Sequence, residues 1–192
     1  MQLYKYTSYG EYKKAQIDYN VLKQDLVWAK RTVIKSVASY LKRFEPKLGM
    51  CHGVRNGAEM KMFEKYLPGC QVHGTEISYT AENLKNVFIW DFHEVHEQWL
   101  DAYDFIYSNS MDHAYNPAKA VRAWGRCIKS GGHIVIEHTR NHMDSTVHDP
   151  FGVRYDELKP LLSEWLGGKF SVEYVKKYMD IRKTKLIYIR KK

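Results

Sequence analysis

Short apolar segments alternate with amphipathic ones between residues 46 and 166, and this alternation constrains the fold more than any other feature of the sequence. Apolar runs typical of strands come at 48–51, 70–77, 87–91, 104–108 and 133–136. Three- and four-residue spacing typical of helices comes at 57–67, 79–85, 117–128 and 155–166. Strands that alternate with helices predict a parallel sheet with helices on both faces.

The C-terminal segment adds a second constraint. Residues 169–178 and 183–190 read as two strands joined through Met179-Asp180, which predicts a hairpin and therefore one antiparallel strand. The expected fold is α/β, Rossmann-like, with a mostly parallel seven-stranded sheet whose last strand is antiparallel. In such sheets ligands bind at the carboxyl ends of the strands, so the residues directly after each strand are the candidate site.

The N-terminal 45 residues precede this alternation. Apolar residues recur at helical spacing from Tyr19 to Phe44, which predicts one helix that ends before Pro46. We therefore expect two parts: a helical leader or lid over residues 1–45 and a ligand-binding domain over residues 46–192.

The charge is concentrated at the two ends of the chain. The protein has 30 Lys+Arg against 22 Asp+Glu, and residues 1–45 and 169–192 carry net charges of +5 and +7. Basic ends are compatible with a nucleic acid or an acidic partner, and equally with a solvated surface. The remainder, residues 46–168, is mildly acidic.

Cysteine spacing and hydropathy bear on the compartment. The three cysteines are widely spaced and form neither a disulfide framework nor a zinc pattern, so a reducing compartment is expected. The first 14 residues lack the apolar run of a signal peptide, and no segment approaches 18 apolar residues. These features predict a cytoplasmic protein without a membrane span.

Glycines and acids come directly after the predicted strands. The first strand leads into Cys51-His52-Gly53-Val54-Arg55-Asn56-Gly57 and then a helix, where free N–H groups could face a ligand. Glu76 ends the second strand, 23 residues after Gly53, a spacing at which a carboxylate accepts both hydroxyls of a ribose. Asp91 comes after the third strand beside Phe92, where it could accept from an exocyclic amine while the ring stacks on a purine.

Residues 47–139 resemble the class I S-adenosylmethionine-dependent methyltransferases. The glycine loop stands at their first motif, GTEIS resembles the acidic second motif, and VFIWDF resembles the third. YDFIYSNSMDHAYNP resembles their fourth-strand stretch, and AWGRCIKSGGHIVIEH resembles the subsequent helix, Gly-Gly turn and fifth strand. The resemblance implies S-adenosylmethionine as cofactor and methyl transfer as activity.

The same resemblance implies a set of cofactor-binding residues. They are Gly49, Cys51, His52, Gly53, Glu76, Ile77, Ser78, Asp91, Phe92, Ser108, Asn109 and Ser110. One motif departs from the family pattern, since Gly49 stands at the position of an acid, and Cys51 and Arg55 at two glycine positions. Glu59 or Asp112 could replace the missing acid at the ammonium of the methionine part.

Candidate catalytic and acceptor-binding residues come after the fourth and fifth strands. His113 is the candidate base, because an imidazole titrates near neutrality; capping the next helix is its structural alternative. Arg140 and His142 lie in the polar loop 138–154 and are candidates for substrate binding. That loop is rich in His and Asp, but its spacing lacks a fixed set of ligands, and no metal site is expected.

The segment after the fourth strand bears on the class of acceptor. Enzymes that methylate exocyclic amines of bases commonly carry an Asn/Asp/Ser-Pro-Pro-aromatic run there, and Ser108-Asn109-Ser110-Met111 lacks the prolines. We therefore expect a small molecule or a sugar as acceptor. Two alternatives remain: an RNA or DNA methyltransferase that uses the basic ends, and a non-catalytic binding or assembly module on the same fold.

Overall fold

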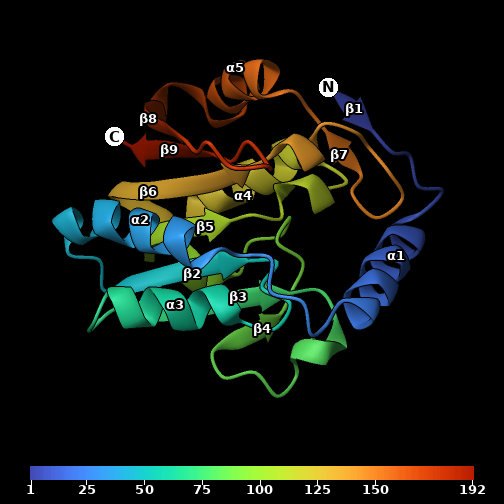
Figure 1. Ribbon diagram of the computed structural model, residues 1–192, viewed down its shortest axis with the longest axis horizontal. Coiled ribbons are helices and arrows are strands. Elements are labelled where there is room, and N and C mark those ends of the chain that lie inside the picture. The colour runs from blue at the N-terminus through green and yellow to red at the C-terminus, as the bar shows by residue number, and fades with distance from the viewer.

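The computed structural model describes residues 1–192 and contains a seven-stranded sheet of order β4-β3-β2-β5-β6-β9-β8 (Figure 1). Its strands are β2 (Leu48–His52), β3 (Gln71–Glu76), β4 (Val87–Ile89), β5 (Tyr103–Ser108), β6 (Ile128–His138), β8 (Phe170–Lys177) and β9 (Lys185–Lys191). Adjacent strands from β4 to β6 are parallel, whereas β9 is antiparallel to both neighbours. The predicted fold, including its antiparallel last strand, is confirmed.

Helices cover both faces of the sheet. Helices α2 (Arg31–Leu41) and α3 (Ala58–Tyr66) pack on one face, where Val37 and Phe63 share a core with Tyr107 of β5. Helices α4 (Pro117–Cys127) and α5 (Tyr155–Leu166) pack on the other, where Trp124 and Leu162 contribute to a second core. The two cores arise because strand side chains alternate between faces. None of the helices combines the length and apolar character that crossing a membrane requires.

The N-terminal helix prediction is wrong in its bounds. In place of one helix over Tyr19–Phe44, the chain forms α1 (Tyr9–Leu22) and α2, separated by non-helical residues 23–30. Leu22, Leu26 and Val27 contributed to the apparent helical period, yet each is more than half exposed. The inward face of α1 is instead polar, so the helix has no apolar period for the sequence to reveal.

Two local interactions fix the position of α1. Ser8 caps it by accepting the N–H of Glu11, and the Glu11 carboxylate accepts the N–H of Thr7, one residue ahead of the position used in a capping box. Ahead of it, β1 (Gln2–Leu3) pairs antiparallel with β7 (Phe151–Gly152), a small sheet that the sequence did not predict. The N-terminus is thereby joined to the loop after β6, and α1 lies at one end of the main sheet (Figure 1).

Candidate functional site

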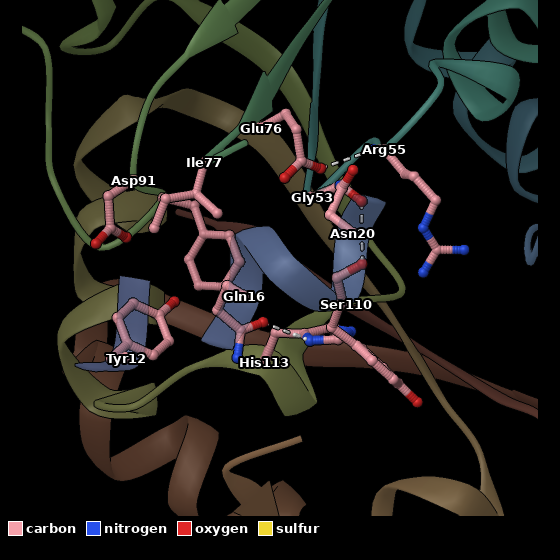
Figure 2. A pocket seen from close by; sticks show the side chains of 12 residues that line it. Tyr12, Gln16, Asn20, Gly53, Arg55, Glu76, Ile77, Asp91, Ser110 and His113 are labelled. Atoms are coloured by element: carbon pink, nitrogen blue, oxygen red, sulfur yellow. Dashed lines mark hydrogen bonds between the residues drawn. The ribbon is translucent and has the colours of Figure 1, made fainter. Parts of the chain in front are cut away.

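A cavity, here the first cavity, opens between α1 and the carboxyl ends of the parallel strands (Figure 2). It is lined by Tyr12, Gln16, Tyr19 and Asn20 of α1, and by Gly53, Arg55, Glu76, Ile77, Asp91, Phe92, Ser110 and His113 from the strand ends. The strand order reverses between β2 and β5. The cavity therefore lies where open α/β sheets bind their ligands.

Glu76, the last residue of β3, presents its carboxylate to this cavity (Figure 2). One oxygen accepts the backbone N–H of Arg55 at 2.8 Å, and the other accepts that of Ser78 at 3.2 Å. These bonds fix the side chain, which is only 6% exposed. Because each carboxylate oxygen has two lone pairs, both can still accept hydroxyl groups of a ligand.

The loop after β2 passes close to the cavity in a left-handed backbone conformation. Gly53, Arg55 and Gly57 have φ angles of 71°, 48° and 70°, whereas Cys51 lies within β2. A Cβ at Gly53 would lie 2.7 Å from the Cβ of Ser110, so the close approach requires glycine. The alternating left-handed positions of the loop are therefore 53, 55 and 57.

This corrects the alignment of the first motif by two residues. With the glycine positions at 53, 55 and 57, the residue at the position of the family's acid is Cys51 instead of Gly49. Gly49 has a packing reason of its own, since a Cβ there would lie 2.2 Å from the ring of Phe105. The sequence could not show the shift, because an arginine occupies a left-handed position that usually carries glycine.

Asp91 comes after β4 and is held from two sides. His93 contacts one carboxylate oxygen through its backbone N–H at 2.9 Å and its ring Nδ1 at 2.6 Å, and the Tyr9 hydroxyl donates to the other at 2.9 Å. Burial raises the pKa of Asp91, but the hydrogen bonds from His93 and Tyr9 outweigh it and lower the pKa overall. The carboxylate is thus kept ionised beside the Phe92 ring, as an acceptor for an amine.

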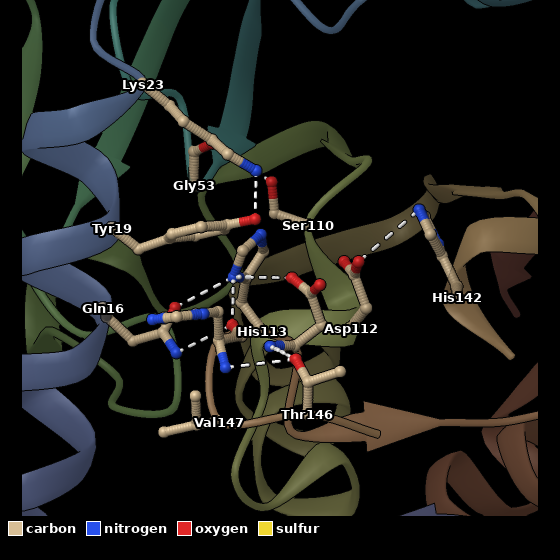
Figure 3. A network of polar contacts seen from close by, with 12 residues as sticks. Gln16, Tyr19, Lys23, Gly53, Ser110, Asp112, His113, His142, Thr146 and Val147 are labelled. Atoms are coloured by element: carbon tan, nitrogen blue, oxygen red, sulfur yellow. Dashed lines mark hydrogen bonds and ion pairs between the residues drawn. The ribbon is translucent and has the colours of Figure 1, made fainter. Parts of the chain in front are cut away.

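His113 comes after β5 and faces α1 across the cavity (Figure 3). Its Nδ1 lies 2.9 Å from Oε1 of Gln16 and 3.0 Å from the carbonyl oxygen of His148. Because the His148 carbonyl can only accept, Nδ1 carries the hydrogen in the neutral ring. Nε2 is then left with its lone pair, which is the state that a general base requires.

A second cavity adjoins the first. It shares Tyr19, Gly53, Arg55, Ser110 and His113 with the first cavity. Its other walls are Lys23, Leu26, Trp28, Ala29, Val54, Asn56, Glu59, Asn109, Asp112, Asn141, His142 and Asp149. Acidic and basic side chains thus face the same space.

One group in this wall has the composition of a metal site. The ligand atoms of Asp112, His113 and Asp149 lie within 4.8 Å of one another. However, the His113 Nδ1, which is 3.7 Å from an Asp149 oxygen, already donates to the His148 carbonyl. In the neutral ring, Nδ1 is therefore occupied by hydrogen bonding. The other acid, Asp112, has one oxygen 3.6 Å from Nε2 of His142 and one buried without a partner.

The structure sorts the residues predicted from the sequence by their place. Those that line the first cavity are Gly53, Glu76, Ile77, Asp91, Phe92, Ser110 and His113. Asn109 and His142 line the second cavity. Gly49, Cys51, His52, Ser78, Ser108 and Arg140 line neither cavity.

The residues of this last group have other surroundings. His52 is buried and stacked on Trp124, and burial lowers its pKa to about 3. Ser78 and Ser108 are fully buried below the strand ends. Arg140 is exposed on a short turn after β6, with its side chain outside both cavities.

Sequence reasoning missed the contribution of α1. Tyr12, Gln16 and Asn20 come at steps of four residues and face inward, where Gln16 contacts His113 and Asn20 accepts the hydroxyl of Thr80. Two signals were present: a Ser-x-x-Glu capping pattern at residues 8–11, and buried polar residues at helical spacing. Neither is read by a search for apolar periodicity.

Comparison with known proteins gives structural matches only. No family model and no curated protein sequence matches the chain. The 1,6-didemethyltoxoflavin-N1-methyltransferase of Burkholderia thailandensis, solved with S-adenosylhomocysteine, matches with a TM-score of 0.72 and 13% identity over 98% of this chain and 92% of that one. The plantazolicin methyltransferase BpumL, in complex with S-adenosylhomocysteine, matches with a TM-score of 0.70 and 12% identity over 95% of each chain.

A third match shows that the fold also carries other chemistry. The (4+2)-cyclase SpnF matches with a TM-score of 0.62 and 11% identity over 82% of this chain and 80% of that one. Together with the sheet order and the cavity at the strand ends, the matches show that the chain has the class I S-adenosylmethionine-dependent methyltransferase fold. The reaction must be argued from the site.

Proposed function

We propose that the protein transfers the methyl group of S-adenosylmethionine to a small-molecule acceptor held between α1 and the strand ends. The observation that carries the proposal is the Glu76 carboxylate, fixed by two backbone N–H groups and directed into the first cavity beside the left-handed loop at Gly53. A carboxylate in this position is suited to the two hydroxyls of a ribose. Asp91 and Phe92 lie on the same wall, where they would receive the adenine.

The cofactor supplies an electrophilic methyl group on a sulfonium, and the chain supplies placement and a base. Nε2 of His113 would accept the proton of an acceptor that must lose one, and the hydrogen bonds at Nδ1 would hold the ring in that tautomer. Aligning the acceptor with the methyl group accounts for much of the acceleration in such a displacement. His142, on the wall of the second cavity, is a candidate contact for the acceptor.

Helix α1 would act as a lid over the site. Its contacts across the cavity include three side-chain hydrogen bonds: Tyr9 donates to Asp91, Gln16 accepts from His113, and Asn20 accepts from Thr80. Contacts of this kind exchange with water at a small net cost, so the helix could open for substrate and close to exclude solvent. In this proposal residues 1–45 serve two roles, since α2 packs on the sheet while α1 covers the strand ends.

A small-molecule acceptor is supported over a nucleic acid by the cover that α1 forms over the site. This helix carries Glu11 and Asp18 against Lys13 and Lys14, so it brings no net positive charge to the strand ends for binding phosphates. Titration calorimetry and thermal melting with S-adenosylmethionine and S-adenosylhomocysteine test the first step.

We expect heat of binding and a raised melting temperature with both ligands. No response to either would reject the proposal. Incubation with S-adenosylmethionine labelled at the methyl group, offered with an extract separated into small-molecule, RNA and protein fractions, tests the acceptor. We expect label in the small-molecule fraction that depends on His113; label confined to RNA would favour the nucleic-acid alternative.

A further inference from the structure

Glu59, on the first turn of α3, is a buried acid without a side-chain partner. The residue is 5% exposed and lines the second cavity. Apart from its own backbone N–H, no protein group donates a hydrogen bond to its carboxyl. A buried carboxylate in this state costs free energy unless a cation or a donor reaches it, so its position on a cavity wall points to a ligand.

The chemistry of the cavity indicates which part of a ligand would lie there. Glu76 and Asp91, suited to a nucleoside, line only the first cavity, and the two cavities meet at Gly53 and Ser110. A cofactor whose nucleoside fills the first cavity can extend its amino-acid end into the second. Lys23 and Arg55 face that space together with Glu59. The carboxylate and the ammonium of a zwitterion would therefore each meet a group of opposite charge there.

We propose that Glu59 binds the α-ammonium of the cofactor's methionine part and replaces the acid that Cys51 lacks at the end of β2. The inference rests on the proposed function. Glu59 and Cys51 are neighbours: burial raises the pKa of the Cys51 thiol, and the charge of Glu59 adds to that rise. The carboxylate, carried by α3, thus lies beside the thiol at the end of β2.

Titration of Glu59 supports this assignment. Burial raises its pKa to about 8, with Glu76 and Glu137 adding to the rise and Arg55 opposing it. An ammonium beside the carboxyl favours its ionised form, so binding at pH 7 should release a proton. The groups whose charges act on Glu59 are Cys51 of β2, Arg55 of the loop, Glu76 of β3, Tyr107 of β5 and Glu137 of β6. The titratable groups that share its cavity are Lys23, Asp112, His113, His142 and Asp149.

Two ligands separate the ammonium from the rest of the cofactor. S-adenosylhomocysteine carries the ammonium but no sulfonium charge, and 5′-methylthioadenosine lacks the amino-acid end. In calorimetry at pH 8, Glu59→Gln should lower the affinity for S-adenosylhomocysteine by about 10–100-fold, the contribution of a charge-assisted hydrogen bond. The affinity for methylthioadenosine should not change. Glu64→Gln, on the exposed side of the same helix, is the matched control and should behave as wild type.

A second variant returns the acid to the strand. Cys51→Asp in the Glu59→Gln background should restore part of the affinity for S-adenosylhomocysteine, and proton release at pH 7, absent in Glu59→Gln, should return. Unchanged S-adenosylhomocysteine affinity in Glu59→Gln, or equal losses for both ligands, would overturn the assignment and leave the proposed function standing. Wild-type protein that binds neither ligand would overturn both.

Discussion

Nδ1 of His113, at the end of β5, donates a hydrogen bond to Oε1 of Gln16 on α1, 97 residues earlier in the chain. Gln16 also donates through Nε2 to the carbonyl oxygen of His148, which accepts from the same Nδ1. The three residues form a closed set of hydrogen bonds between the helix, the strand end and the loop after β6. The set decides which ring nitrogen of His113 faces a ligand.

The tautomer of His113 is the first prediction. Because Nδ1 donates to two acceptors, the neutral ring should carry its proton there and leave Nε2 unprotonated. Nitrogen-15 chemical shifts of the imidazole, assigned with a His113→Ala variant, measure this. Gln16→Ala should increase the share of the other tautomer. A ring protonated mainly at Nε2 in wild type would contradict the assignment of His113 as a base.

Glu76→Ala should lower the affinity for S-adenosylhomocysteine by about 10–100-fold, since the two ribose hydroxyl groups would lose a charged acceptor. The variant also leaves the N–H groups of Arg55 and Ser78 without their acceptor, so its melting temperature must be measured alongside. Glu82→Ala, an exposed acid a few residues later, serves as control. A folded Glu76→Ala protein with wild-type affinity would remove the ribose assignment.

Gly53→Ala should impair both stability and ligand binding. Its φ of 71° disfavours any side chain, at about 1–2 kcal/mol, and its Cβ would also lie 2.7 Å from that of Ser110. Gly69→Ala is the matched comparison, with a φ of 84° and no atom within 4 Å of a Cβ. Urea denaturation should show the larger loss for Gly53→Ala, and only that variant should bind S-adenosylhomocysteine less well. Equal effects would mean that crowding at Gly53 is unimportant.

The pH dependence of stability should report Glu59. Because its pKa is raised to about 8 in the folded protein, the native state holds a proton that the unfolded chain releases above about pH 4.5. The free energy of unfolding contributed by this group therefore falls as pH rises from 4.5 through 8. Glu59→Gln removes this pH dependence, so its free energy of unfolding relative to wild type should rise by on the order of 4 kcal/mol between about pH 5 and pH 8.5. Denaturation midpoints at both pH values measure this, with Glu64→Gln as control; a constant difference between Glu59→Gln and wild type would contradict it.

Two buried histidines should change the stability with pH in the opposite direction. Burial lowers the pKa of His52 and of His138 to about 3. In the unfolded chain both titrate near 6.5, so the unfolded state binds more protons between pH 6.5 and 3, and stability falls as pH falls through that window. Proton NMR should show both rings neutral at about pH 4.5. A midpoint near pH 6 for either ring would mean that it is hydrated in solution.

The order of elements and the acids at the strand ends were determined by the sequence alone. Strand and helix periods, with the closing hairpin, were enough for the sheet, because the central strands β2, β5 and β6 are largely buried on both faces and contain short apolar runs. Glu76 and Asp91 could be identified because a residue directly after such a strand lies at the ligand-binding edge whatever the details of packing. These inferences depend only on local pattern and on general rules of topology.

Only the tertiary structure decided how α1, the loop after β2 and the loop after β6 meet. The inward face of α1 is polar because it lines a cavity, so it has no apolar period, and its partners His113 and His148 are distant in sequence. The left-handed backbone at Arg55 hid the register of the first motif, which moved the missing acid from Gly49 to Cys51. The role proposed for Glu59 also depends on the tertiary structure. Its burial and its lack of a side-chain partner result from the packing of several segments and cannot be seen in one segment alone.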